Sequence, residues 1–153
     1  MSTGIFSIAR SGMDVEHQRL EIIAQNLANA NTTRTATGEA YQPLRLVSGP
    51  RVAAFDAQLA AVAATSNGNA LSATSYSGVQ TFGVEASDAP PRLVYDPTHP
   101  HADAKGFVHY PGLDHAGEMA LMVQTLRVYE ANTVMFSAAR SMYMRALDLG
   151  SKG

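Results

Sequence analysis

The C-terminal segment Asp114–Leu149 reads DHAGEMALMVQTLRVYEANTVMFSAARSMYMRALDL. Its apolar residues recur at spacings of three and four, which predicts a helix about 50 Å long with Gly150 just past its end. One heptad row comprises Leu121, Thr125, Val128, Asn132, Met135, Ala139, Met142, Ala146 and Leu149. A second row comprises Met119, Met122, Leu126, Tyr129, Thr133, Phe136, Arg140, Tyr143 and Leu147. Two rows of this length need more than one partner.

A second amphipathic helix is expected from about Ile5 to Ala30. Small or apolar residues recur there at Ala9, Met13, Leu20, Ile23, Leu27 and Ala30. This helix would be only about 40 Å long and could cover one row of the C-terminal helix. Because the remaining row needs another partner, the sequence predicts oligomerisation.

The middle of the chain offers little that could cover the second row. Four short strands are expected, bounded by prolines and glycines: Tyr41–Val47, Val79–Glu85, Arg92–Tyr95 and Phe107–Tyr110. Residues 48–78 contain a small and polar run and are interpreted as a flexible insert. The expected organisation is a helical segment 1–33, a middle region 34–113 of strands and loops, and a helical segment 114–153. The fold class is mainly α with a small β-subdomain.

Composition narrows the function classes. The 153 residues are 46% hydrophobic and only 16% charged, with a net charge of −2 and no cysteine. A surface so poor in charge favours burial against other chains. The absence of a basic field argues against nucleic-acid binding. The absence of cysteine excludes disulfides, thiol catalysis and thiolate zinc sites.

The ends and apolar runs of the chain give no sign of membrane targeting. Residues 1–10 lack the basic and apolar regions of a cleavable secretory signal. No run approaches the roughly 20 apolar residues that a membrane-spanning helix needs. We therefore expect no cleavable signal and no direct membrane insertion.

No catalytic motif or cofactor-binding loop is recognisable, so neither an enzyme nor a cofactor is expected. Four histidines, His99, His101, His109 and His115, crowd into one stretch. A zinc site would need three or four converging ligands, and ordinary loop histidines explain the pattern as well. We expect no metal site.

Several motifs connect the chain to a known family. Arg19–Thr33 reads RLEIIAQNLANANTT and resembles the signature of flagellar basal-body rod and hook proteins. Leu93–Pro100 reads LVYDPTHP, followed by ADAKGFV at residues 102–108. These, with Tyr129–Asn132 and the closing Arg145–Gly150, resemble the FlgC family of proximal-rod proteins. The resemblance covers nearly the whole chain except residues 48–78.

The resemblance implies a non-enzymatic structural subunit of the rod that crosses the periplasm. It implies that the terminal helices pair as an antiparallel coiled coil and stack around a central channel. It also implies export through the flagellar export apparatus, and contact with other copies, neighbouring rod proteins and the base adaptor FliE. A different rod component, or an independent helical adaptor, is the alternative.

Subunit contacts are expected along both helices, at Met13, Leu20, Ile23, Asn26, Leu27, Asn29, Leu121, Leu126, Val128, Asn132, Met135, Phe136, Met142 and Tyr143. Within this set, Asn26 and Asn29 have two interpretations. They could fix register between subunits, as a buried asparagine does in coiled coils. They could instead only cap the first helix and start a turn.

Overall fold

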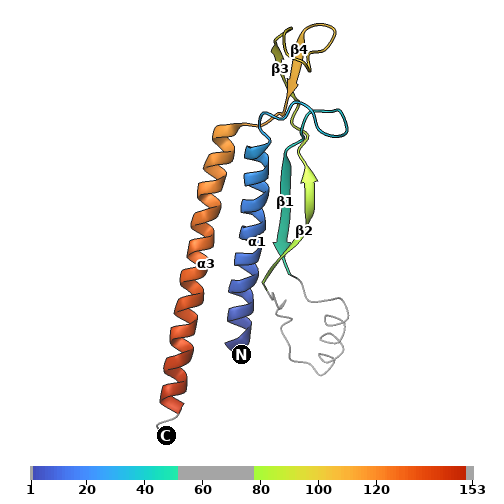
Figure 1. Cartoon of the computed structure of the whole chain (residues 1–153). Coiled ribbons are helices and arrows are strands. Elements are labelled where there is room, and N and C mark those ends of the chain that lie inside the picture. Colours follow the sequence, from blue (N-terminus) through green and yellow to red (C-terminus); the bar gives the residue numbers. More distant parts are fainter. Residues whose placement is uncertain (1, 52–77, 151–153) are drawn as a thin grey trace, which may run out of the picture. The chain divides into compact units, whose positions relative to one another are not determined.

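The computed structural model describes residues 2–51 and 78–150, with side chains from residue 4 onward. The first and last elements of the chain are two long helices, α1 (Ser2–Ala28) and α3 (His115–Gly150). Between them lie β1 (Leu44–Pro50), β2 (Val79–Ala86), β3 (Arg92–Tyr95) and β4 (Phe107–Tyr110). Figure 1 shows these elements along the chain. The expected fold class, mainly α with a small β-subdomain, is confirmed.

Local chemistry sets the helix boundaries. Asp114 caps α3, because its Oδ1 accepts a hydrogen bond from the Ala116 N–H at 3.1 Å. At the end of α1, Asn29 Nδ2 donates to the Gln25 carbonyl at 2.9 Å and Thr32 donates to Asn29 Oδ1 at 3.1 Å. Gly150 is the last residue of α3 and does not follow its end as expected.

The strands form two separate two-stranded sheets, β1–β2 and β3–β4. Arg92–Tyr95 and Phe107–Tyr110 match their expected bounds, whereas the first strand begins at Leu44 and not at Tyr41. Residues 41–43 precede the strand, because the Tyr41 N–H donates to the Thr32 carbonyl at 3.2 Å and Pro43 has no N–H. The Pro43 carbonyl still accepts from the Ser87 N–H, just after β2, at 2.7 Å. Residues 48–50 extend β1, and most of the expected insert, residues 52–77, lies outside the described residues.

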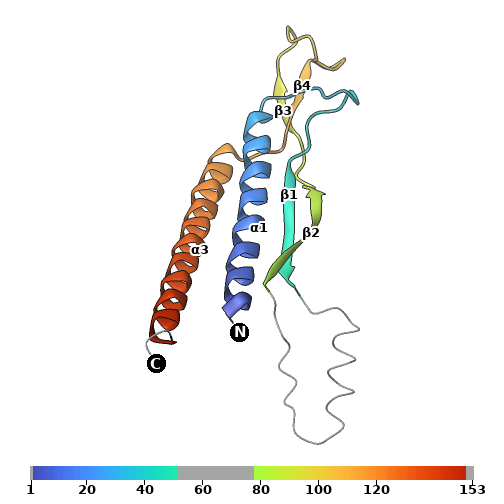
Figure 2. The same cartoon turned by 60° about the horizontal axis from the view of Figure 1, so that its bottom comes forward.

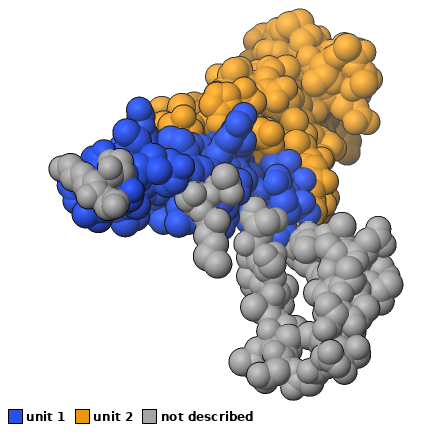
Figure 3. Space-filling view, turned by 90° about the horizontal axis from the view of Figure 1, so that it is seen from below, with its two compact units in different colours: residues 1–15, 48–81, 131–153 blue, residues 16–47, 82–130 orange. Residues whose placement is uncertain are grey.

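The chain divides into two compact units, coloured separately in Figure 3. Unit 1 contains residues 1–15, 48–81 and 131–153, and unit 2 contains residues 16–47 and 82–130. Each unit takes part of α1 and part of α3, and in each the two helical parts lie side by side and antiparallel, as Figure 2 also shows. The antiparallel helix pair expected of the terminal segments is therefore present within both units.

Unit 1 is held together by small residues and an aromatic cluster. The Phe6 ring meets Phe136 edge-on at 5.2 Å and Tyr143 at 6.2 Å between ring centroids. Gly12 lies against Asn132, where a Cβ added to the glycine would be 3.0 Å from the amide nitrogen. Close approach of the helices at this level therefore depends on a residue without a side chain.

Unit 2 has a mixed core. Ile22 and Ile23 of α1, Val108 of β4 and Thr125 of α3 are buried. Two strongly polar side chains, Asn26 and Glu118, are buried with them. Buried polar groups are costly unless each finds a partner, so these two residues identify the first candidate site.

Candidate functional site

Asn26 is fully buried in unit 2, and its side chain makes four hydrogen bonds. Its Oδ1 accepts from the Leu44 N–H at 2.8 Å and from the Tyr41 hydroxyl at 3.0 Å. Its Nδ2 donates to the Leu44 carbonyl at 2.9 Å and to Glu118 Oε2 at 3.4 Å. An amide side chain can make about four hydrogen bonds, and all four are accounted for. Asn26 therefore ties the start of β1 to both helices.

Glu118 completes this cluster from α3. Its side chain is only 2% exposed and forms an ion pair with Arg45 of β1, whose side chain is 47% exposed. Burial, and secondly the negative charge of Glu118, raise the pKa of Tyr41 above its ordinary value. The Tyr41 hydroxyl therefore stays protonated at neutral pH and can donate to Asn26. We call Asn26, Tyr41, Arg45 and Glu118 the polar cluster.

The polar groups of the cluster are paired with one another. Every polar group of Asn26 is paired, and the one buried carboxylate is neutralised by Arg45. Such an arrangement fixes the relative register of three elements within unit 2. Asn29, in contrast, bonds only locally to Gln25 and Thr32, as a cap does.

A second candidate site is the exposed side of α3 in unit 1. At 3.6 residues per turn, Met135, Ala138, Met142, Arg145 and Leu149 form one stripe. We call these five residues the outer row. All five are exposed, and the three large apolar side chains are 65% (Met135), 62% (Met142) and 78% (Leu149) exposed. Isolated exposed apolar residues are common, but a continuous stripe of them indicates an interaction surface.

The buried side of α3 draws on both predicted heptad rows. Thr125 and Ala139 come from the first row and are buried, as is Glu118, which the rows left out. Half-buried residues complete this side at Met122, Tyr129, Asn132 and Phe136. The buried side of α3 therefore contains residues of both rows. The first-row residues Val128, Met135, Met142 and Leu149 are left uncovered by the described part of the chain.

The structure separates the residues expected at subunit contacts into covered and exposed sets. Ile23 and Asn26 are buried. Half-buried members are Met13, Leu20, Leu27, Asn29, Leu121, Asn132 and Phe136. Exposed members are Leu126, Val128, Met135, Met142 and Tyr143. Their contact with other subunits stays a prediction.

Sequence patterns did not identify Tyr41 and Arg45 as site residues. They also did not show that the side chains of Asn26 and Glu118 contact each other. The available signal was Glu118 itself, an acidic residue four positions before Met122 on the side of α3 that the structure buries. A carboxylate on such a face requires a cation nearby. Which cation it is depends on contacts between distant segments, and residue spacing does not reveal those.

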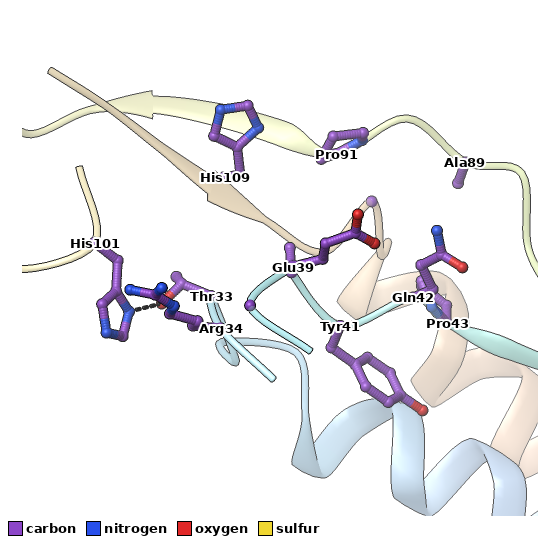
Figure 4. A pocket seen from close by; sticks show the side chains of 13 residues that line it. Thr33, Arg34, Glu39, Tyr41, Gln42, Pro43, Ala89, Pro91, His101 and His109 are labelled. Atoms are coloured by element: carbon purple, nitrogen blue, oxygen red, sulfur yellow. Dashed lines mark hydrogen bonds between the residues drawn. The ribbon is translucent and has the colours of Figure 1, made fainter. Parts of the chain in front are cut away.

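Two of the four clustered histidines, His101 and His109, border a cavity of about 370 Å³ in unit 2, which Figure 4 shows. His101 Nδ1 lies 2.9 Å from the Thr33 hydroxyl oxygen, and His109 Nε2 lies 3.8 Å from Asp103 Oδ2. Within residues 2–51 and 78–150, no three His, Cys, Asp or Glu side chains gather as a metal ion would require. In the same part of the chain, no helix is long and apolar enough to span a membrane.

Comparison with known proteins places similarity at both ends of the chain. Residues 6–34 match the family described as flagella basal body rod protein. Residues 104–149 match the family described as flagellar basal body rod FlgEFG protein C-terminal. The first match covers most of α1 and the asparagine-rich turn, and the second covers α3.

Relatives of known function extend the similarity over nearly the whole chain. The chain is 36% identical to flagellar basal-body rod protein FlgC of Escherichia coli O6:H1, over 95% of this chain and 96% of the relative. It is 34% identical to FlgC of Salmonella typhimurium, with the same two coverages. It is 32% identical to FlgC of Bacillus subtilis, over 94% of this chain and 95% of the relative.

Proposed function

The chain belongs to the FlgC family of flagellar basal-body rod proteins and is a structural subunit of the rod, and from this premise we propose how it is built into that rod. The helix pair assembles with other subunits into the proximal rod, an axial drive shaft that transmits torque across the periplasm and encloses the export channel. The subunit carries out no reaction. Its relatives are named as rod proteins, which supports this role.

The outer row is the observation that carries the proposal. Its three large apolar side chains remain mostly exposed although α3 already packs against α1 within each unit. Burying a large apolar side chain contributes roughly 1.5–3 kcal/mol, so covering three of them would contribute several kcal/mol to each contact. That free energy is available only when another subunit lies on the row.

Membership of the rod protein family supports the partners that we propose. They are other copies of the chain, neighbouring rod proteins, the base adaptor FliE and, during delivery, the flagellar export apparatus. We propose that the subunit reaches the rod through that apparatus and contacts proteins of the rod without direct membrane insertion. No nucleic acid is involved, in keeping with a net charge of −2.

Mass spectrometry of intact basal bodies from the source organism tests the proposal. The chain should be present in the rod fraction at a few copies per particle. Its absence from otherwise complete rods would refute the proposal and favour an independent helical adaptor.

The role of the outer row is tested by a matched pair of substitutions on α3. Met142→Glu puts a charge into the row, whereas Ser137→Glu puts the same charge on an exposed position about 140° around the helix. We expect rods to contain the Ser137→Glu chain and to lack the Met142→Glu chain. Equal incorporation of both variants would show that the outer row makes no subunit contact.

A further inference from the structure

The β3–β4 hairpin of unit 2 has one exposed apolar face. Its register pairs Leu93 with His109 and Tyr95 with Phe107, and all four side chains lie on the same side. We call these four residues the hairpin face. Leu93 is 56% exposed and Tyr95 is 66% exposed. The Tyr95 and Phe107 rings meet edge-on at 5.3 Å, so the aromatic surface is continuous.

The opposite side of the hairpin contains its fully buried residue. Val94 pairs with Val108, which is fully buried. The Arg92 guanidinium lies 5.3 Å from the centre of the Tyr110 ring. A two-stranded hairpin needs one packed face for stability, and this side supplies it. Within the hairpin face, His109 lines the cavity of unit 2, whereas Leu93, Tyr95 and Phe107 stay exposed. Exposed aromatic patches of this kind are typical of protein interfaces.

The loop that joins the two strands is fixed by its own side chains. Asp96 Oδ1 accepts hydrogen bonds from the Thr98 N–H at 3.1 Å and from the Thr98 hydroxyl at 2.7 Å. Asp103 Oδ1 accepts from the Lys105 and Phe107 N–H groups at 2.8 and 2.9 Å. A surface ordered before binding loses little entropy when a partner arrives.

Gly106 allows the Tyr95 ring to lie where it does. The glycine has a φ of +82°, and a Cβ added there would be 3.0 Å from the Tyr95 ring. Any other residue would be strained at this φ and would push the ring aside. The position of the largest exposed ring is therefore built into the loop.

We propose that the hairpin face of one subunit packs on the outer row of a second copy of the same chain, a contact that rests on the rod assignment above. The outer row presents methionines to aromatic rings, a favourable and adaptable combination of side chains. It also contains one cation, Arg145, between Met142 and Leu149. The matching anion is Asp103 at the edge of the hairpin face, whose Oδ1 accepts from the Phe107 N–H and whose Oδ2 lies 3.8 Å from His109 Nε2.

The geometry of a rod favours this pairing of unlike surfaces. A contact between identical surfaces closes into a dimer and stops growth. A contact between two different surfaces leaves one of each free at every step and can continue around a shaft. The hairpin face and the outer row are two such surfaces on one chain, and they are complementary in chemistry.

Photo-crosslinking in assembled rods tests the contact. Tyr95 is replaced by p-benzoylphenylalanine in the full chain, and isolated basal bodies are irradiated and digested for mass spectrometry. Because Tyr95 is mostly exposed, the larger ring should be accommodated without loss of the fold. We expect a product of twice the chain's mass, in which residue 95 is joined to a peptide from residues 131–150 of another copy. The same photoreactive residue at the exposed Ala36 should not reach that peptide.

Substitutions of Arg145 test whether the crosslink reports a specific contact or only that the two segments are near each other. Arg145→Glu places like charges at the contact and should lower the yield of the crosslinked dimer several-fold, whereas Arg145→Lys should retain most of it. A product with a different protein, or with another segment of this chain, would overturn the inference. So would rods that contain the photoreactive chain and form no crosslink at Tyr95 or, with the probe moved, at Leu93. Failure of the rod assignment itself would be distinguishable, because the chain would then be missing from the rod fraction.

Discussion

Replacing Asn26 by alanine tests whether the polar cluster holds the start of β1 on the two helices. The change removes four hydrogen bonds and leaves the N–H and carbonyl of Leu44 without their side-chain partner. A part-buried polar group deprived of its partner costs about 1–3 kcal/mol, so the two Leu44 groups together amount to about 3 kcal/mol. That is a large share of the roughly 5–15 kcal/mol that stabilises a typical domain.

Amide hydrogen exchange of Leu44 measures this effect at the affected bond. A loss of about 3 kcal/mol corresponds to exchange about 100-fold faster in Asn26→Ala than in the unchanged chain. Asn29→Ala is the matched control, because its side chain bonds only to Gln25 and Thr32 at the helix end. It should leave the Leu44 amide nearly unchanged.

Asn26→Asp sharpens the same test. Aspartate keeps an oxygen for the Leu44 N–H and the Tyr41 hydroxyl, but it loses the two N–H donors and places a second carboxylate beside Glu118. Like charges in a buried site are strongly unfavourable, so Leu44 protection should also fall at neutral pH and recover partly in acid. Leu44 amides that exchange at the same rate in all three variants would refute the reasoning.

Further predictions concern stability, pH and assembly. Arg45→Ala should lower the urea midpoint more than Glu118→Gln. Removing Arg45 leaves the buried Glu118 carboxylate without its cation, which costs about 3–5 kcal/mol of unfolding free energy, whereas an unpaired Arg45 can turn to solvent. Gly78→Ala should lower the free energy of unfolding by at least about 1 kcal/mol, because this glycine has a φ of +112°, which alanine rarely adopts. Hydrogen bonds, first from the Phe107 N–H, lower the pKa of Asp103 below its ordinary value of 3.8, so its stabilisation is complete above that value. It should be lost as the pH falls through the folded-state pKa, and amide exchange in the β3–β4 loop should then accelerate; an acid-insensitive loop would contradict this. Circular dichroism should show more helix in assembled rods than in the isolated chain, and full helicity in the isolated chain would favour an independent adaptor.

The helices and the short strands could be predicted because their signals are local. Heptad spacing located α3 to within one residue at each end, and the prolines and glycines around Arg92–Tyr95 marked a strand with the correct bounds. The first strand was displaced by three residues because its start is decided elsewhere. Tyr41 is held by Thr32 and Asn26, and the backbone of Leu44 is bonded to an asparagine 18 positions earlier.

The polar cluster could not be predicted for the same reason. Asn26 was recognised as important, with a choice between helix cap and subunit register, but the structure shows its hydrogen bonds directed to β1 and to Glu118, 92 positions away. Periodicity identifies which side of a helix is buried. It does not identify which residue from another segment will meet that side, because this depends on how the loops return the chain.

The separation of polar and apolar groups on α3 suits a shaft subunit. Around Asn26 and Glu118 the contacts are hydrogen bonds and an ion pair, which tolerate only one register. The outer row has no comparable polar group apart from Arg145, and methionine packs against many shapes. A helix built in this way keeps its own fold fixed while allowing neighbours to lie at slightly different heights or angles. The same division explains why a substitution in the polar cluster should change the fold of the single chain, whereas one in the outer row should change only whether that chain enters the rod.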